Sequence, residues 1–246
     1  MTAIPSTLVL VHGAGHTARV WETVRRHLSA PSVAVDLPGR RDRAGDLPAV
    51  TITESAAGIA ADVTAATAAR VVLVGHSVGG IVLPEVAARL DGRVDHLVFV
   101  AGLCAKDGDT VADTVSPGRS AQFTERLGEL RARYAGHMLE PEGACAAAPA
   151  IHDPRVAMSI DSLNFMSQTV SWEGVDPGTP RTFVRCLRDR IQPRAMQARL
   201  AENCAAADVI DIDSGHTPAL QAPAALAAIL DGIASGSAAR ADERVV

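Results

Sequence analysis

The sequence predicts an α/β protein in which helices flank a mostly parallel sheet. Short apolar segments rich in β-branched residues alternate along the chain with longer segments of helical character. The strand-like segments are apolar throughout, which is typical of a parallel sheet buried on both faces. Of the 246 residues, 48% are hydrophobic and 21% are charged, which supplies a large core and excludes a disordered or low-complexity chain.

The expected strands are short apolar runs, and several end at glycine or at a turn-forming sequence. They are Thr7–Val11, Ser32–Asp36, Arg70–Gly75, Val94–Val100, Thr182–Leu187 and Asp208–Ile212. The expected helices are Ala18–Leu28, Thr53–Ala69, Val78–Leu90, Gln192–Glu202 and Pro218–Ile233. Pro84 falls inside the third of these helices and predicts a kink there, because proline removes a backbone donor.

The strand and helix alternation stops in the middle of the chain, at residues 104–180, where the sequence predicts helices and no strand. Apolar residues recur there at helical spacing: Phe123, Leu127, Leu130, Tyr134 and Met138, and then Val156, Ile160 and Leu163 after the helix-starting pair Asp153-Pro154. We therefore expect residues 104–180 to form a helical cap on a core made of residues 1–103 and 181–234. Residues 235–246 are expected to be a flexible tail.

Composition and charge exclude several classes of partner. The 23 basic and 28 acidic residues give a net charge of −5, which leaves no extended basic face for nucleic acid. No run approaches the ~18 apolar residues of a membrane span, and Met1–Pro5 lacks the pattern of a secretion signal. We expect a cytoplasmic protein that binds neither nucleic acid nor a membrane.

No cofactor or metal is expected. The chain has no phosphate-binding glycine motif, no Rossmann glycine motif after a strand and no metalloprotease or calcium-loop motif. The four cysteines form no CxxC pair and match no zinc spacing, so we expect free thiols; they are Cys104, Cys145, Cys186 and Cys204.

The segment Gly75-His76-Ser77-Val78-Gly79 carries the strongest chemical signal. It fits the G-x-S-x-G pattern of a nucleophile elbow, between an apolar strand and a helix. Side chains at the two glycines would collide with neighbouring backbone, and the strained turn keeps the serine hydroxyl exposed. The pattern predicts that Ser77 is a catalytic nucleophile.

The loop after the first strand, His12-Gly13-Ala14-Gly15, has the composition of an oxyanion loop. In elbow enzymes this loop supplies one backbone N–H group to the oxyanion hole, and the residue after the nucleophile supplies the other. We assign these donors to Ala14 and Val78. Small residues here let the backbone approach a substrate closely.

The nucleophile also needs a base and an acid from loops at the same sheet edge. His216 follows the last expected strand and best meets this requirement for the base. Asp189 follows the preceding strand and is the expected acid, with Asp213 and the pair Asp107 and Asp109 as competitors. The order serine, aspartate, histidine along the chain is that of α/β-hydrolases.

These motifs together resemble the α/β-hydrolase superfamily. They are VLVHGAGH, DLPG at Asp36–Gly39, VGHSVGG, FVRCLRDRIQP and DSGHTP. Within it the chain resembles the compact branch of plant methyl-ester esterases of the salicylate-binding type, hydroxynitrile lyases and related bacterial esterases. The resemblance extends from residue 7 to about residue 234. It implies the α/β-hydrolase fold, an eight-stranded, mostly parallel sheet with a small helical cap after the sixth strand.

The resemblance also bears on individual positions. The chain begins at the strand that carries His12, so the first one or two strands of larger members are expected to be missing. The nucleophile, acid, base and oxyanion positions of the branch fall on Ser77, Asp189, His216, Ala14 and Val78. His16 matches a histidine in the same loop of the branch and is expected to line the pocket, with candidates from the end of the cap: Trp172, Phe165 and Met166.

The sequence therefore predicts a serine hydrolase that cleaves esters of small, largely apolar molecules. A lactonase, a carbon–carbon bond hydrolase, a lyase or cyclase with the same three residues, and a non-catalytic ligand receptor are alternatives. In the hydroxynitrile lyases that the chain resembles, a lysine follows the catalytic histidine. Here Thr217 stands at that position, and the only lysine, Lys106, lies at the start of the expected cap.

Overall fold

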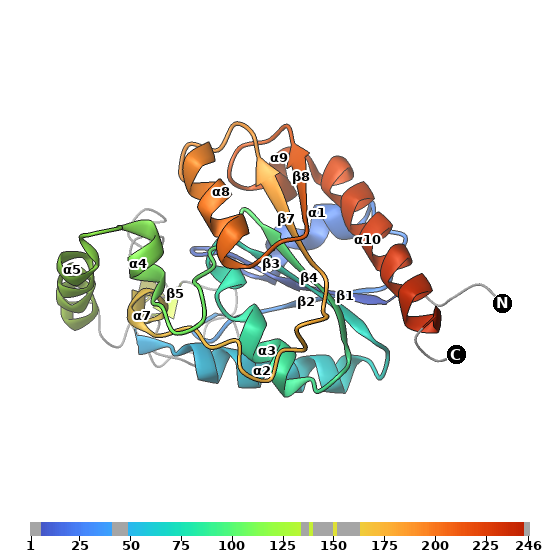
Figure 1. The fold of residues 1–246 in the computed structure, drawn as a ribbon, viewed down its shortest axis with the longest axis horizontal. Helices are drawn as coiled ribbons and strands as arrows, with labels where there is room; N and C mark the ends of the chain where they lie inside the picture. Colours follow the sequence, from blue (N-terminus) through green and yellow to red (C-terminus); the bar gives the residue numbers. More distant parts are fainter. Residues whose placement is uncertain (1–5, 41–48, 134–137, 140–149, 152–162, 244–246) are drawn as a thin grey trace.

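Six parallel strands form the central sheet of the computed structural model, in the order β2-β1-β3-β4-β7-β8 (Figure 1). The structure describes residues 6–40, 49–133, 138–139, 150–151 and 163–243. The strands are β1 (Thr7–Val11), β2 (Ser32–Val35), β3 (Val71–His76), β4 (Val94–Val100), β7 (Arg181–Cys186) and β8 (Asp208–Ile212). Each lies within a residue or two of its expected position, and the parallel α/β architecture is confirmed.

Both faces of the sheet are buried, as the unbroken apolar runs predict. Successive side chains of a strand point to opposite faces, so Val9 and Val11 of β1 join one core cluster and Leu8 and Leu10 join the other. The first cluster includes residues of α2 (Ile52–Ala66), α3 (Leu83–Arg89) and α8 (Arg194–Asn203). The second includes residues of the short helices η1 (Ala18–Trp21) and α1 (Glu22–Arg25), of α9 (Pro218–Gln221) and of α10 (Pro223–Glu243).

Local sequence explains where several helices begin. Thr51 and Glu54 form a reciprocal capping box at the start of α2, in which each side chain bonds the other residue's backbone N–H. The prediction of a kink at Pro84 is wrong. The chain forms a short 3-10 turn, η3 (Ser77–Gly80), and α3 starts at Leu83, so Pro84 lies in the first turn of a helix, where its missing N–H costs no hydrogen bond.

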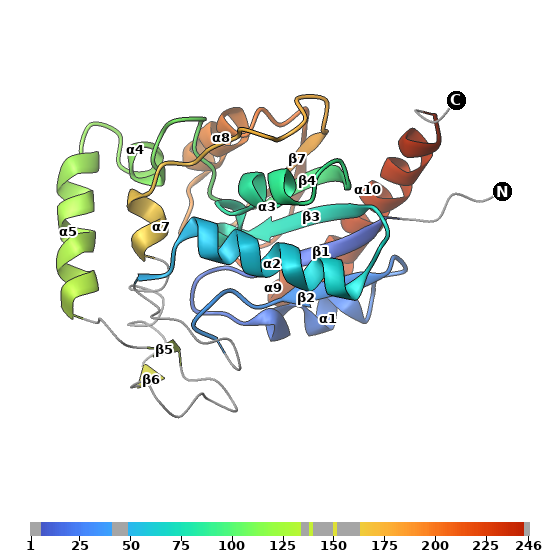
Figure 2. The ribbon, with the colours of Figure 1, turned by 90° about the horizontal axis from the view of Figure 1, so that it is seen from below.

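The insertion between β4 and β7 carries α4 (Val111–Val115), α5 (Ser120–Arg133) and α7 (Leu163–Ser167). These helices pack on one another, α4 also contacts α8, and both views place α5 at the outer edge of the molecule (Figures 1 and 2). The insertion also contains two short parallel strands, β5 (Met138–Leu139) and β6 (Ala150–Ile151), which the sequence did not predict. Two-residue strands are too short to leave a periodic pattern, and Met138 lies in β5 rather than in the helix.

Some expectations fall outside the described residues or need correction. Cys145 and the start of the helix expected at Asp153-Pro154 lie outside the described residues. The three cysteines that are described are free and buried. The described sheet has six strands, which agrees with the expectation that the first strands of larger members are missing, and the insertion therefore follows the fourth strand of this chain instead of a sixth. In the segment expected to be a flexible tail, residues 235–246, α10 continues to Glu243 through alanine-rich sequence that favours helix.

No helix in the described part of the chain is long and apolar enough to span a membrane.

Candidate active site

The turn from β3 into η3 presents Ser77 in a strained conformation. Ser77 has a φ of 50°, which is unusual for a residue with a side chain, and it directly follows the last residue of β3. A methyl group at Gly75 would lie 2.7 Å from the Gly79 carbonyl oxygen, and one at Gly79 would lie 2.6 Å from the His12 carbonyl oxygen. The tight backbone contacts expected for a nucleophile elbow are therefore present.

Three loops bring Ser77, His216 and Asp189 into one hydrogen-bonded chain. His216 Nε2 lies 3.0 Å from Ser77 Oγ, and His216 Nδ1 lies 2.7 Å from Asp189 Oδ2. Asp189 follows β7 and His216 follows β8, the two neighbouring strands at one edge of the sheet. A carboxylate, an imidazole and a hydroxyl in this order form the arrangement that activates a serine in hydrolases.

Asp189 is held as an anion. Its side chain is buried, and its Oδ1 accepts hydrogen bonds from the backbone N–H groups of Ile191 at 2.7 Å and Gln192 at 2.9 Å. Burial alone would raise the pKa of Asp189. The bonds from the His216 imidazole and from the two N–H groups outweigh burial and hold the pKa below its ordinary value.

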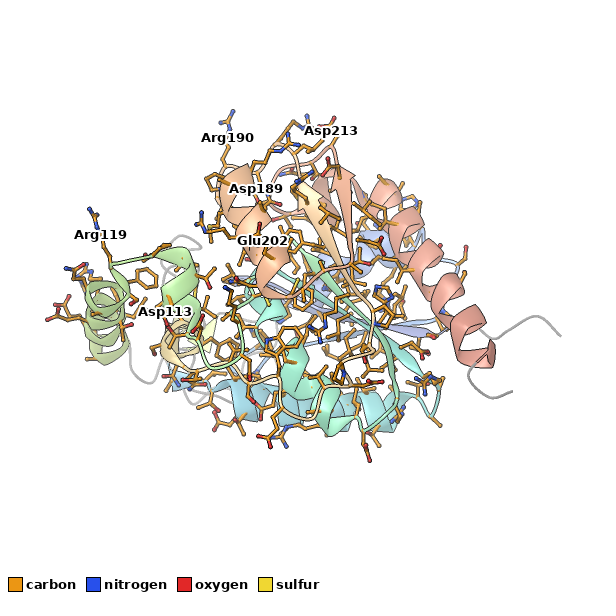
Figure 3. All side chains as sticks on the ribbon, viewed as in Figure 1. Asp113, Arg119, Asp189, Arg190, Glu202 and Asp213 are labelled. Atoms are coloured by element: carbon orange, nitrogen blue, oxygen red, sulfur yellow. The ribbon has the colours of Figure 1, made fainter. Side chains whose placement is uncertain are left out.

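The competing carboxylates have other partners. Asp213 forms an ion pair with Arg188 at 2.8 Å, and its side chain is 76% exposed. Asp107 accepts a hydrogen bond from the backbone N–H of Trp172. In Figure 3, Asp213 lies at the outer edge of the molecule, whereas Asp189 lies nearer its centre. Asp109 is exposed. The geometry therefore favours Asp189 over these three carboxylates as the acid partner of His216.

His76 joins the turn that carries Ser77 to the loop that carries His216. Burial and the nearby His216 ring lower the pKa of His76 to about 3, so the imidazole is neutral. Its Nε2–H donates to the His216 backbone oxygen at 2.7 Å. Nδ1 is then an acceptor, and it is buried without a partner in the described part of the chain. This bond fixes the backbone of the residue that contacts Ser77.

A second buried histidine orients the loop after β1. Burial and then Arg40 lower the pKa of His12, which keeps the imidazole neutral. Its Nδ1–H donates to the Gly13 oxygen at 2.9 Å, and its Nε2 accepts from the backbone N–H of Leu37 at 3.1 Å. The Gly13 oxygen and the Ala14 N–H belong to one trans peptide and point in opposite directions. The ring of His12 therefore sets the direction of the Ala14 N–H.

A cavity of about 580 Å³ opens at these residues. Its described walls include Ser77, His216, Ala14 and Val78, so both expected oxyanion donors lie at the cavity with the serine. Most of the other lining side chains are apolar: Leu103, Val115, Phe123, Leu127, Leu130, Met166, Ile191 and Met196. A mostly apolar cavity with a serine hydroxyl and an imidazole on its wall suits a small, apolar ligand that carries one polar group.

The pocket residues expected from the sequence divide into two pairs. His16 and Met166 line the cavity. Phe165 is fully buried in the core and is not among the lining residues. Trp172 also lies elsewhere: its Nε1–H donates to the Ala105 oxygen, and the Arg181 guanidinium stacks 4.4 Å from the centre of its ring.

Several described lining residues were not predicted as site residues. The apolar spacing of Phe123, Leu127 and Leu130 predicts a helix face, and that face of α5 borders the cavity. Gln192 and Met196 also line it, and no pattern in the sequence singles them out. Within the described residues, no group of three or more histidine, cysteine or acidic side chains is arranged to hold a metal ion.

Comparisons with known sequences agree with the motifs. The model of the alpha/beta hydrolase family matches residues 8–229. Methylesterase 17 of Arabidopsis thaliana is 23% identical over 181 residues, which cover 65% of each chain. Lipase LipV of Mycobacterium tuberculosis is 32% identical over 112 residues, 45% of this chain and 42% of that protein. The chain thus matches less than two thirds of the length of these curated relatives.

Solved structures show the same fold. A pyrethroid hydrolase from Sphingobium faniae superposes with a TM-score of 0.69 at 21% identity, over 93% of this chain and 97% of that one. An extracellular alpha/beta-hydrolase from a Paenibacillus species gives a TM-score of 0.72 at 18% identity, over 94% and 99% of the two chains. With a family model that matches nearly its whole length and a fold shared with these hydrolases, the chain belongs to the alpha/beta hydrolase family.

Proposed function

We propose that this hydrolase is a serine carboxylesterase that cleaves esters of small, largely apolar molecules through an acyl-enzyme. The observation that carries the proposal is the hydrogen-bonded chain from Asp189 through His216 to Ser77, with spacings of 2.7 and 3.0 Å. Relatives named methylesterase and methyl ester esterase support ester bonds as the target.

In the proposed reaction, Ser77 Oγ attacks the ester carbonyl carbon while His216 Nε2 takes the hydroxyl proton. Asp189 holds the His216 ring in the required tautomer and stabilises its charged form. The N–H groups of Ala14 and Val78 bind the oxyanion that develops on the carbonyl oxygen. His216 then protonates the departing alkoxide, and the acyl group remains on Ser77.

A water molecule completes the cycle. His216 Nε2 takes a proton from the water, whose oxygen attacks the acyl carbon, and Ser77 leaves with that proton restored to its Oγ. Each step uses side chains and backbone groups of this chain together with water. The apolar walls of the cavity favour a small, largely apolar acyl or alcohol group.

The cavity also bears on the lyase alternative. Cleavage of a cyanohydrin needs a positive charge beside the departing cyanide. Thr217, the residue after His216, lines the cavity, and Lys106 is exposed. Arg126, on α5, is the permanently charged basic side chain among the described lining residues, and it is paired with Glu129 at 2.6 Å. Ester hydrolysis therefore fits the described cavity better than cyanide release.

A substrate panel tests the proposal. Wild type and Ser77→Ala are assayed side by side with methyl and aryl esters, lactones, carbon–carbon hydrolase substrates and cyanohydrins. We expect wild type to hydrolyse esters and Ser77→Ala to lose about 10⁶-fold in kcat, as serine hydrolases do when the nucleophile is removed. Cyanide release that depends on Ser77, with no ester hydrolysed, would establish the lyase alternative instead.

A further inference from the structure

The peptide group that joins Ser214 to Gly215 is hydrogen-bonded at both of its polar atoms. The Ser214 oxygen accepts from the Arg188 N–H at 2.9 Å, and the Gly215 N–H donates to the side-chain oxygen of Gln221 at 2.7 Å. Gly215 directly precedes the proposed base, His216. The Gln221 side chain therefore holds the backbone one residue before the histidine that performs proton transfer in the proposed reaction.

Gln221 lies on a helical turn that is fixed to the core. It is the last residue of α9, and its backbone N–H donates to the Thr217 oxygen at 3.2 Å. Pro218 and Ala219, in the same turn, are buried, and Ala219 belongs to the core cluster on one face of the sheet. Gln221 itself is exposed. Its amide thus joins a fixed helix to the neighbouring loop without being part of the core.

The surroundings of the Gln221 amide define which of its atoms faces the loop. A backbone N–H only donates, so the amide atom that contacts Gly215 is the oxygen. The hydroxyl of Ser214, a fully buried residue, donates to the same oxygen at 3.3 Å. A methyl group at Gly215 would lie 2.6 Å from this oxygen, and the three atoms nearest to that methyl group all belong to Gln221. The absence of a side chain at Gly215 therefore leaves room for the amide.

A second hydrogen bond acts on the other side of His216. The His216 carbonyl oxygen accepts from His76 Nε2 at 2.7 Å, so the peptide groups before Gly215 and after His216 are both held. The imidazole between them lies 3.0 Å from Ser77 Oγ and 2.7 Å from Asp189 Oδ2. Such an arrangement tolerates little displacement, since a shift of about 1 Å at a reacting group costs about 10²-fold in rate.

We propose that Gln221 is a positioning residue that keeps His216 within reach of Ser77 through its hydrogen bond to the Gly215 N–H. The inference rests on the proposed esterase function, in which His216 is the base. Without the Gln221 side chain, water can accept from this exposed N–H, so little folding free energy is lost. Water is not attached to the core, however, and the imidazole is then aligned with Ser77 for less of the time.

Three variants test the inference on ester hydrolysis. Gln221→Ala removes the acceptor and should lower kcat about tenfold at unchanged KM, the equivalent of one neutral hydrogen bond. Gln221→Glu keeps an oxygen that accepts both bonds and should retain most of the activity. Gln122→Ala, which replaces an exposed glutamine on α5, is the matched control and should equal wild type. Equal kcat in Gln221→Ala and wild type, or no rescue by Gln221→Glu, would overturn the inference.

A double-mutant cycle determines whether Gly215 and Gln221 act together. The methyl group of Gly215→Ala would displace the Gln221 amide, so this variant should also lose about tenfold in kcat. After Gln221→Ala the obstructing atoms are absent, and adding Gly215→Ala should cost nothing further. A loss of about 10²-fold in the double variant would mean that the two changes act independently, and it would contradict the inference.

Thermal unfolding separates positioning from a role in stability. Gln221 is exposed and water can replace its oxygen, so the Tm of Gln221→Ala should lie within about 2 °C of the wild-type value. A larger fall in Tm would show that the side chain stabilises the whole fold, and the inference would then be wrong.

Hydrogen exchange separates this inference from the proposed function, because deuterium uptake by the loop is measured by mass spectrometry without any substrate. Exchange at the Gly215 amide should be faster in Gln221→Ala than in wild type, and Gln221→Glu should restore it. This result would support the hydrogen bond even if wild type hydrolysed no ester, in which case only the proposed function fails. Equal exchange in wild type and Gln221→Ala would overturn the inference. Ser77-dependent hydrolysis that Gln221→Ala leaves unchanged would support the esterase and contradict the role of Gln221.

Discussion

The Nε2–H of His76 donates a 2.7 Å hydrogen bond to the backbone oxygen of His216. His76 directly precedes Ser77 in the chain, so this bond links the backbone of the proposed base, His216, to the turn that carries the proposed nucleophile. The two residues are 140 positions apart, and the bond forms only when β3 and the loop after β8 are both in place. Because the donor is a buried neutral imidazole, we expect the folded state to lose stability at low pH.

Replacing His76 by glutamine should flatten the dependence of stability on pH. Buried His76 has a pKa of about 3, whereas an unfolded histidine titrates near 6.5. Above pH 6.5 both states are neutral and the stability is complete. As the pH falls from 6.5 toward 3, the unfolded chain gains a proton that the folded state excludes, so stability is lost. Between pH 6.5 and pH 4 this loss is on the order of 3 kcal/mol.

Urea unfolding at pH 4 to 7.5 measures this effect in wild type, His76→Gln and the control His27→Gln, which removes an exposed histidine. His76→Gln should lose less stability on acidification than wild type, and His27→Gln should follow wild type. Some slope should remain in His76→Gln, because burial also lowers the pKa of His12. Equal slopes for wild type and His76→Gln would contradict a neutral, buried His76.

Replacing Asp189 by asparagine should lower kcat by about 10⁴-fold, the size of loss seen when the acid of such a triad is made neutral. The amide would leave the His216 ring without the carboxylate that fixes its tautomer. Asp213→Asn and Asp107→Asn are matched controls, because those carboxylates bond Arg188 and the Trp172 N–H instead. Steady-state rates with one ester rank the three variants. A near wild-type rate in Asp189→Asn, with loss in either control, would reassign the acid.

A methyl group at Gly13 should lower the rate of ester hydrolysis about 10²-fold. It would lie 2.8 Å from His76 Nδ1 and 3.0 Å from Ser77 Cβ, so one of these residues has to move. A displacement of about 1 Å at a reacting group costs a factor of this size. Gly232→Ala, on α10 with open space around it, should keep full activity and gain slightly in Tm. Equal kcat/KM in Gly13→Ala and wild type would contradict the close packing of this turn.

The core of the fold was predictable because its signals are local. Each strand of the parallel sheet is a continuous apolar run, and the alternation of strands with helices excludes other layer arrangements. The start of α3 was misplaced, because the 3-10 turn at Ser77–Gly80 depends on the contacts of its glycines with His12 and Leu103. The pair of two-residue strands β5 and β6 depends on contacts within the insertion, which periodicity does not reveal.

Residues of the candidate site were predictable where a sequence motif or a position directly after a parallel strand marks them. Ser77 lies in a motif, and residues after neighbouring parallel strands must meet at one edge, which brings Asp189 and His216 together. Pocket residues followed no such rule. Phe165 and Met166 are adjacent, yet the first is buried in the core and the second lines the cavity, because the packing of α7 decides which side chain faces inward.

The role of Ser77 as nucleophile is tested most directly by mass spectrometry after treatment with a fluorophosphonate, which forms a covalent bond with an activated serine. Wild type should gain one mass increment that maps to the peptide containing Ser77, and Ser77→Ala should gain none. Asp189→Asn should be labelled much more slowly, since its His216 is a poorer base. An adduct on another residue, or ester hydrolysis in a wild type that resists labelling, would contradict Ser77 as the nucleophile.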